Sequence, residues 1–145
     1  MTASAAETLR AGPAPDDSDR PFWEGLREGR LMLPQCGACG RRRPLGRAMC
    51  ASCWSFQTTW AEAGAVGTVH TWVRSARSFM SELDVPVPYV TVLVQLDDVP
   101  VRLLGILVDE DARPAIGDRV AGVIQHPANS EWPVLRWQLA REVIR

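Results

Sequence analysis

From Gly64 onward, apolar and polar residues alternate in a way that predicts a series of short β-strands. The first stretch, GTVHTWVRSA, alternates from one residue to the next, and successive side chains of a strand point to opposite faces of its sheet. Its two expected faces carry Val69, Thr71 and Val73 against His70, Trp72 and Arg74.

Four more stretches continue this pattern: YVTVLVQLD, VRLLGILVD, RVAGVIQH and PVLRWQL. Proline, glycine and aspartate separate them, with a turn predicted at Asp97, Asp98 and Pro100. Gly105 indicates a bulge or bend within its strand. Five strands within residues 61–145 fit a small barrel such as an OB-fold, or a short sandwich.

Helical spacing occurs only near the start, in DRPFWEGLREGR, and predicts one short helix over residues 20–30. Asp19 is placed to cap it, Pro21 suits its first turn, and Gly29 suits a left-handed stop. So short a helix is marginal alone in water, so it must dock on the protein's own body or on a partner. The apolar residues expected on its docking side, and at a partner interface, are Phe22, Trp23 and Leu26.

Residues 1–19 are rich in Ala, Pro, Asp and Ser and are expected to form a mobile tail. They contain no apolar core like that of a signal peptide, and no apolar run approaches the length of a membrane span. We therefore expect a cytoplasmic protein that does not bind membranes, in a compartment that keeps thiols reduced.

All four cysteines lie within residues 31–60, in two Cys-x-x-Cys pairs separated by ten residues, and the ligands are Cys36, Cys39, Cys50 and Cys53. In a reducing compartment this spacing predicts a zinc ribbon, or iron in the same site, rather than disulfides. Four thiolates complete a tetrahedral Zn²⁺ site and leave no position for water or substrate. The metal is therefore expected to be structural rather than catalytic.

Between the two pairs lie Arg41, Arg42, Arg43 and Arg47, with no acidic residue among them. They could bind phosphates of nucleic acid or of a nucleotide-like cofactor, or compensate the −2 charge of a tetrathiolate zinc site. The net charge of −1 argues against a free-standing nucleic-acid binder. Trp54 and Trp60 lie nearby, and a tryptophan just after a knuckle is expected to pack beneath the metal.

No catalytic set is recognisable in the sequence. The chain has no lysine, which excludes a Schiff-base lysine and a P-loop lysine. The two histidines, His70 and His126, have no serine, cysteine or carboxylate at a recognisable catalytic spacing. A chain without nucleophile, base or open metal is either not an enzyme or depends on a partner for them.

The order of these parts carries a resemblance. PFWEGLREGRLMLPQC leads into the four-cysteine ribbon, followed by GAVGTVHTW, PYVTVLVQLDDVPVRLLGILVD and IGDRV. This order resembles the bacterial and archaeal family first described as domain of unknown function 35, over residues 20 to about 138. The resemblance implies a mainly β protein: an N-terminal helix, a rubredoxin-like zinc ribbon and a C-terminal five-stranded OB-fold.

The family resemblance also implies a function in acyl-CoA metabolism. It implies a hetero-oligomer in which a thiolase-like enzyme carries the catalytic residues, with the chain as a non-catalytic subunit. The implied reactions on CoA thioesters are retro-aldol cleavage of steroid side chains, thiolysis in aromatic degradation, or acyl transfer. For CoA phosphates, we expect contacts from Arg74 and Arg77, which leave the first barrel strand where an OB-fold opens its binding face.

Two other functions compete with this one. The arginines and interleaved tryptophans of the ribbon would suit a module that binds single-stranded nucleic acid, a common role of OB-folds. An independent hydrolase of CoA thioesters is the third hypothesis, and the sequence offers no residues to carry that reaction.

Overall fold

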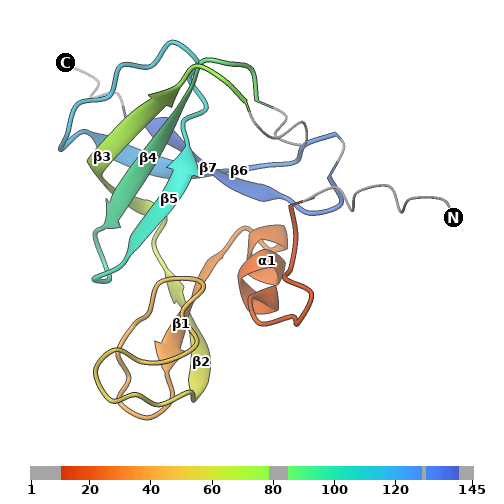
Figure 1. Ribbon diagram of the computed structural model, residues 1–145, viewed down its shortest axis with the longest axis vertical. Helices are drawn as coiled ribbons and strands as arrows, with labels where there is room; N and C mark the ends of the chain where they lie inside the picture. The colour runs from red at the N-terminus through yellow and green to blue at the C-terminus, as the bar shows by residue number, and fades with distance from the viewer. Residues whose placement is uncertain (1–10, 79–84, 129, 141–145) are drawn as a thin grey trace, which may run out of the picture.

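The computed structural model describes residues 11–78, 85–128 and 130–140, and it is mainly β, as the sequence predicts (Figure 1). One helix, α1 (Arg20–Arg27), precedes a two-stranded hairpin of β1 and β2 and a five-stranded antiparallel sheet in the order β5-β4-β3-β6-β7. The strands are β1 (Leu31–Cys36), β2 (Thr58–Ala63), β3 (Val66–Ser75), β4 (Tyr89–Leu96), β5 (Arg102–Ile106), β6 (Arg119–Gln125) and β7 (Val134–Leu139).

The sheet curls into the half-barrel expected of an OB-fold. Strand β3 pairs with β4 along most of its length, but with β6 only over Val66–Thr68. A parallel bridge between Leu107, which directly follows β5, and Trp137 of β7 brings the sheet's two edges together. In Figure 1 the hairpin of β1 and β2 lies below this sheet, with its loops directed away from it.

The expected faces of β3 were wrong, because a bulge shifts the register between Val69 and Thr71. Paired residues of antiparallel strands share a face, so the partner of each β3 residue identifies its side. Val69 and Trp72 lie opposite the buried Val94 and Val92, on the concave face. Thr71 lies opposite Leu93 on the convex face, and beyond the bulge β3 is exposed through Arg74.

The bulge predicted at Gly105 is absent, because the pairing of β4 with β5 is unbroken from Thr91 to Gln95. The glycine instead makes room for Trp137, the largest fully buried side chain. A Cβ at position 105 would lie 2.5 Å from Cδ1 and 2.6 Å from Nε1 of that indole. The core around Trp137 consists mainly of aliphatic residues from β3 to β6, continuous with Leu26, Leu31 and Leu33 of the helix and first hairpin.

Helix α1 ends at the predicted glycine. Gly29 has φ +75°, its N–H donates to the carbonyl of Leu26, and the N–H of Arg30 donates to the carbonyl of Gly25. These two bonds form a Schellman motif, which satisfies carbonyls that the last turn leaves unpaired.

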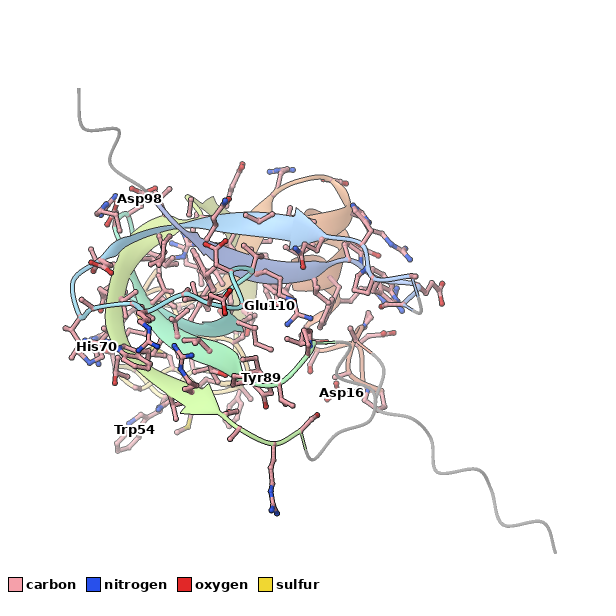
Figure 2. All side chains as sticks on the ribbon, turned by 90° about the horizontal axis from the view of Figure 1, so that it is seen from above. Asp16, Trp54, His70, Tyr89, Asp98 and Glu110 are labelled. Atoms are coloured by element: carbon pink, nitrogen blue, oxygen red, sulfur yellow. The ribbon has the colours of Figure 1, made fainter. Side chains whose placement is uncertain are left out.

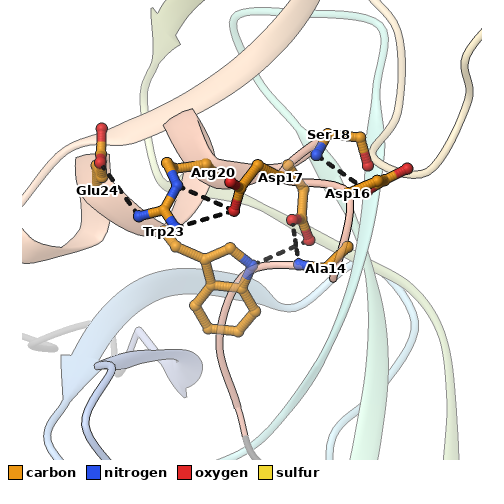
Figure 3. Close-up of polar contacts among 8 residues, drawn as sticks. Ala14, Asp16, Asp17, Ser18, Arg20, Trp23 and Glu24 are labelled. Carbon is orange, nitrogen blue, oxygen red and sulfur yellow. Dashed lines mark hydrogen bonds and ion pairs between the residues drawn. The ribbon is translucent and has the colours of Figure 1, made fainter.

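The start of α1 differs from the prediction, because the Asp19 side chain makes no capping bond to the helix. Its two carboxylate oxygens instead accept from the Ala14 backbone N–H (2.7 Å) and the Trp23 indole N–H (3.0 Å), the two bonds drawn as dashed lines from the labelled Ala14 and Trp23 in Figure 3. Asp19 thus ties the segment before the helix to the helix itself. Of the predicted tail, residues 1–10 lie outside the described residues, whereas Gly12 approaches Trp132 closely.

Candidate functional site

The metal centre forms at the loop end of the ribbon hairpin. Strand β1 delivers Cys36 opposite Thr58 of β2, and the two knuckles fold over that end of the hairpin. The four sulfurs, from Cys36, Cys39, Cys50 and Cys53, all lie within 4.8 Å of one another. The Sγ atoms of Cys36 and Cys53 are 3.5 Å apart, and those of Cys39 and Cys50 are 3.6 Å apart.

These separations fit zinc. With Zn–S bonds of about 2.3 Å, a tetrahedral site separates its sulfurs by about 3.8 Å. Cys36 and Cys50 are buried, whereas Cys39 and Cys53 are exposed. All four ligand positions are thiols of this chain, so this is a structural zinc site of the closed type.

Four thiols this close together can all ionise only if a cation lies between them. The Cys39 backbone N–H donates to Cys36 Sγ and lowers the pKa of Cys36 to about 6. The backbone N–H of Cys53 likewise lowers the pKa of Cys50. The Ser55 N–H favours the thiolate of Cys53, but the neighbouring sulfurs, Cys36 first, and desolvation together outweigh it and raise the pKa of Cys53 to about 11. Four thiolates repel one another, and a divalent cation supplies the charge that lets all four ionise.

Three of the four ribbon arginines donate hydrogen bonds within the ribbon itself. Arg43 is 2% exposed and donates to the carbonyls of Ala48 and Gln57 and to the Thr58 hydroxyl. The other two bonds run from Arg42 to the carbonyl of Ala61 (2.8 Å) and from Arg41 to the hydroxyl of Ser52 (2.5 Å). Arg43 is therefore a structural brace between the loop and β2, which the sequence did not distinguish from its neighbours.

The two ribbon tryptophans do not behave alike. Trp60 of β2 is half-buried and packs against the core. Trp54 is 73% exposed, and Figure 2 shows it projecting outward. The expectation that Trp54 packs beneath the metal was therefore wrong.

A cavity of about 200 Å³ opens where β4 begins, at the end of the sheet where β3 finishes. Its wall combines apolar and polar side chains from four parts of the chain: Val85, Pro86, Tyr89, Leu107, Val108, Glu110, Gln125 and Arg136. Tyr89 and Glu110 are labelled in Figure 2, which views the molecule from above relative to Figure 1. The sequence did not identify this cavity, because its residues are far apart along the chain and share no motif.

Of the two arginines expected at a CoA site, Arg74 lies in β3 near the strand end that borders the cavity. Ser75 pairs with the cavity residue Tyr89, and Arg74 precedes it in β3. Arg74 is exposed and donates to the carbonyl of Ala112 (2.8 Å), which fixes its guanidinium. Arg77 is exposed in the segment after β3. No bound molecule tests these two residues, so their role stays a prediction.

Phe22 and Leu26, expected at a partner interface, are 8% and 1% exposed and belong to the chain's own core. Trp23 is half-buried, with its ring edge-on to that of Phe22 at 5.2 Å. Helix α1 therefore docks on its own body, and only Trp23 keeps substantial exposed surface for a partner.

The part of the chain that the structure describes brings together no catalytic set. His70 and His126 are both exposed and lie in different strands or loops. Glu62, the acidic residue nearest the ribbon in sequence, accepts from Arg30 (3.3 Å). The described helix, α1, is eight residues long, well short of what crosses a membrane.

Two known domain families match this chain, one over the zinc ribbon and one over the barrel. Residues 23–59 match the rubredoxin-like zinc ribbon domain of ChsH2, and residues 60–125 match its C-terminal OB-fold domain. A curated relative, a probable enoyl-CoA hydratase alpha subunit from Thermomonospora curvata, is 29% identical over 114 residues. That alignment covers 76% of this chain but only 35% of the relative, so the chain spans about a third of it.

Two solved structures are similar. A chain of the Ltp2-ChsH2(DUF35) aldolase is 25% identical, with a TM-score of 0.75 over 89% of this chain and 99% of that one. A protein of unknown function of the DUF35 family from Sulfolobus solfataricus is 17% identical. Its TM-score is 0.55 over 88% of this chain and 87% of that chain, a likeness of fold.

Proposed function

Because the chain is a member of the DUF35 family, with the zinc ribbon and OB-fold domains of ChsH2, we propose that it is a non-catalytic accessory subunit in acyl-CoA metabolism. In this proposal it forms a hetero-oligomer with a thiolase-like enzyme that carries the catalytic residues. The observation that carries it is the likeness to the Ltp2-ChsH2(DUF35) aldolase chain, nearly all of which this chain covers. A cytoplasmic location belongs to the same proposal.

The chemistry of the described residues supports an accessory role. All four cysteines lie in one closed metal site, and the exposed histidines stand apart from it. A reaction on a CoA thioester needs a nucleophile or base beside the substrate. On the proposal, the partner supplies these groups and cleaves, thiolyses or transfers the acyl group.

The experiment combines this protein with a thiolase-like protein from the same organism. The two should elute together in gel filtration, and turnover of CoA thioesters by the enzyme should require this subunit. If they elute separately, and neither alters the other's activity or solubility, the proposal is wrong.

We further propose that the end of the sheet around the cavity contacts the CoA thioester, with Arg74 and Arg77 facing its phosphates. Hydrogen bonds to charged groups contribute about 1.5–3 kcal/mol each. Reversing both charges (Arg74→Glu, Arg77→Glu) should therefore weaken acyl-CoA binding by the complex at least about tenfold. Arg102→Glu is the matched control, because Arg102 is exposed and begins β5 opposite Gln95, near the other end of β4. Unchanged binding in the double variant would remove the two arginines from the site.

Binding of single-stranded nucleic acid is less well supported. An electrostatic site for a strand needs several exposed guanidinium groups that can meet successive phosphates. In the ribbon, Arg43 is buried and Arg42 is half-buried, which leaves Arg41 and Arg47 exposed. An independent hydrolase has no supporting observation among the described residues.

A further inference from the structure

The two zinc knuckles of this chain have the same local geometry, so they can be compared position by position. Each knuckle is followed by a residue whose N–H donates to the carbonyl of its first cysteine. Gly40 donates to Cys36 (3.0 Å), and Trp54 donates to Cys50 (2.9 Å). Both residues adopt the left-handed conformation, with φ of +78° for Gly40 and +62° for Trp54.

The two residues are not equivalent energetically. Glycine reaches positive φ without a steric penalty, whereas the Cβ of any other residue approaches the backbone there. Of the described non-glycine residues, positive φ occurs at Trp54 and at Asp17, and aspartate tolerates this region better than tryptophan does. The strain at Trp54 gains no burial in return, because its side chain is 73% exposed. Neither the metal site nor the core accounts for a tryptophan at this position.

Two more exposed apolar side chains come from the same knuckle region of the chain. The N–H of Cys50 donates to the carbonyl of Ser55 (2.9 Å), which places their chain neighbours Met49 and Phe56 near each other. Met49 is 43% exposed and Phe56 is 71% exposed. We call Met49, Trp54 and Phe56 the aromatic tip. It belongs to the ribbon loops, which Figure 1 shows at the end of the molecule away from the sheet.

An exposed apolar cluster of this kind indicates a binding surface, and tryptophan is among the residues that contribute most at the centre of interfaces. The charge around the tip narrows the partner. Residues 31–61 contain four arginines and no aspartate or glutamate, and Arg41 and Arg47 are exposed. Such a surface complements an apolar pocket edged by carboxylates. A nucleic-acid strand fits less well, because it presents a phosphate at every nucleotide and two of the four ribbon arginines, Arg42 and Arg43, are not exposed.

We propose that the aromatic tip docks in an apolar, carboxylate-edged pocket of the thiolase-like subunit, with Trp54 as its anchor. This inference rests on the proposed function and adds the surface by which the subunits assemble. Position 54 then carries a tryptophan because the side chain acts in the complex, although the isolated ribbon would be more stable with glycine.

This idea predicts opposite changes from a single substitution. Trp54→Gly should remove the anchor and weaken affinity for the thiolase-like subunit by about tenfold to a hundredfold, as truncation of an interface hot spot does. The same variant should release zinc to a chelator more slowly, because glycine relieves the strained backbone. A side chain with only a structural role would not produce both changes. Phe56→Ser should also weaken binding.

Ile116→Ser is the matched control, because Ile116 is 74% exposed but lies outside the ribbon, and its affinity should equal that of the wild type. Affinities are measured by calorimetry with a purified thiolase-like protein from the same organism. Zinc release is followed with a colorimetric chelator on the isolated full chain.

The outcomes separate the two proposals. If the wild type binds the thiolase-like protein and Trp54→Gly binds equally well, the aromatic tip is not the contact, and the proposed function stands. If the wild type does not bind at all, both are wrong. If the wild type is a homodimer and Trp54→Gly is a monomer, the tip serves self-association instead. Salt-dependent binding of labelled poly-dT that needs Trp54 would assign it to nucleic acid. Faster zinc release from Trp54→Gly would refute the strain argument.

Discussion

Replacing Gly105 by alanine tests whether a single close contact holds the barrel closed at its centre. A Cβ there would lie 2.5 Å from Cδ1 and 2.6 Å from Nε1 of Trp137. Carbon atoms in contact are normally about 3.5–4.0 Å apart, so one of the two groups must move by about 1 Å. Trp137 does not border solvent, because its side chain is 0% exposed, and its backbone carbonyl accepts from the Val108 N–H.

Overpacking of this kind destabilises proteins by about 1–3 kcal/mol. The lower entropy of the unfolded alanine chain offsets about 0.4–1 kcal/mol of this. We therefore expect a net loss of about 1–2 kcal/mol in the free energy of unfolding, measured by urea titration of the zinc-loaded protein with tryptophan fluorescence. Leu104→Ala, next in β5 and 70% exposed, should change it by less than about 0.5 kcal/mol.

The contact with Trp137 can be isolated by a double-mutant cycle. If the indole is what the new methyl group meets, Gly105→Ala should destabilise a Trp137→Leu background much less than the wild type. Equal losses in both backgrounds, or a neutral Gly105→Ala, would refute the argument from this contact.

Three further predictions concern the metal, an ion pair and the helix stop. Cys39→Ser should lose zinc by elemental analysis, and circular dichroism should show an unfolded ribbon; a folded ribbon without metal would contradict the closed site. Arg119 donates to both carboxylate oxygens of Asp97 (2.8 and 2.5 Å) and lowers the pKa of Asp97 below its ordinary 3.8. That stabilisation is therefore present above pH 3.8 and is lost as the pH falls through the lowered value in the folded protein. Acid titrations of unfolding should show a smaller loss in Asp97→Asn than in the wild type, and an equal loss would be contrary to this reasoning. Gly29→Ala meets no atom within 4 Å but keeps φ at +75°, so thermal unfolding should reveal a loss of about 1–2 kcal/mol from backbone strain alone.

The features that the sequence predicted correctly are those encoded by neighbouring residues. The spacing of the four cysteines determines the metal site, because each knuckle closes within a few residues. The glycine stop of α1 and the division into strands are local in the same sense. A family resemblance added the order of the domains, which the matches to the ChsH2 zinc ribbon and OB-fold confirm.

The failures have a common physical cause, which is contact between distant parts of the chain. The faces of β3 depend on a bulge at His70, and an alternating sequence gives no sign of it. The role of Gly105 depends on Trp137, which is more than thirty positions away, so a packing requirement was taken for a bulge. Asp19 binds the Trp23 indole rather than the helix N-terminus, because tertiary contacts compete with local capping.

The cavity and the aromatic tip lie at opposite ends of the molecule, and this has a consequence for how an accessory subunit would act. Strand β3 begins beside the ribbon, with two residues between it and β2, and its last residue, Ser75, pairs with the cavity residue Tyr89. A strand of ten residues spans about 33 Å. A partner held at the tip and a CoA thioester at the cavity would therefore touch different surfaces, and neither would need to displace the other. If both proposals hold, the ribbon is the part that assembles and the barrel end is the part that meets the substrate, with β3 connecting the two.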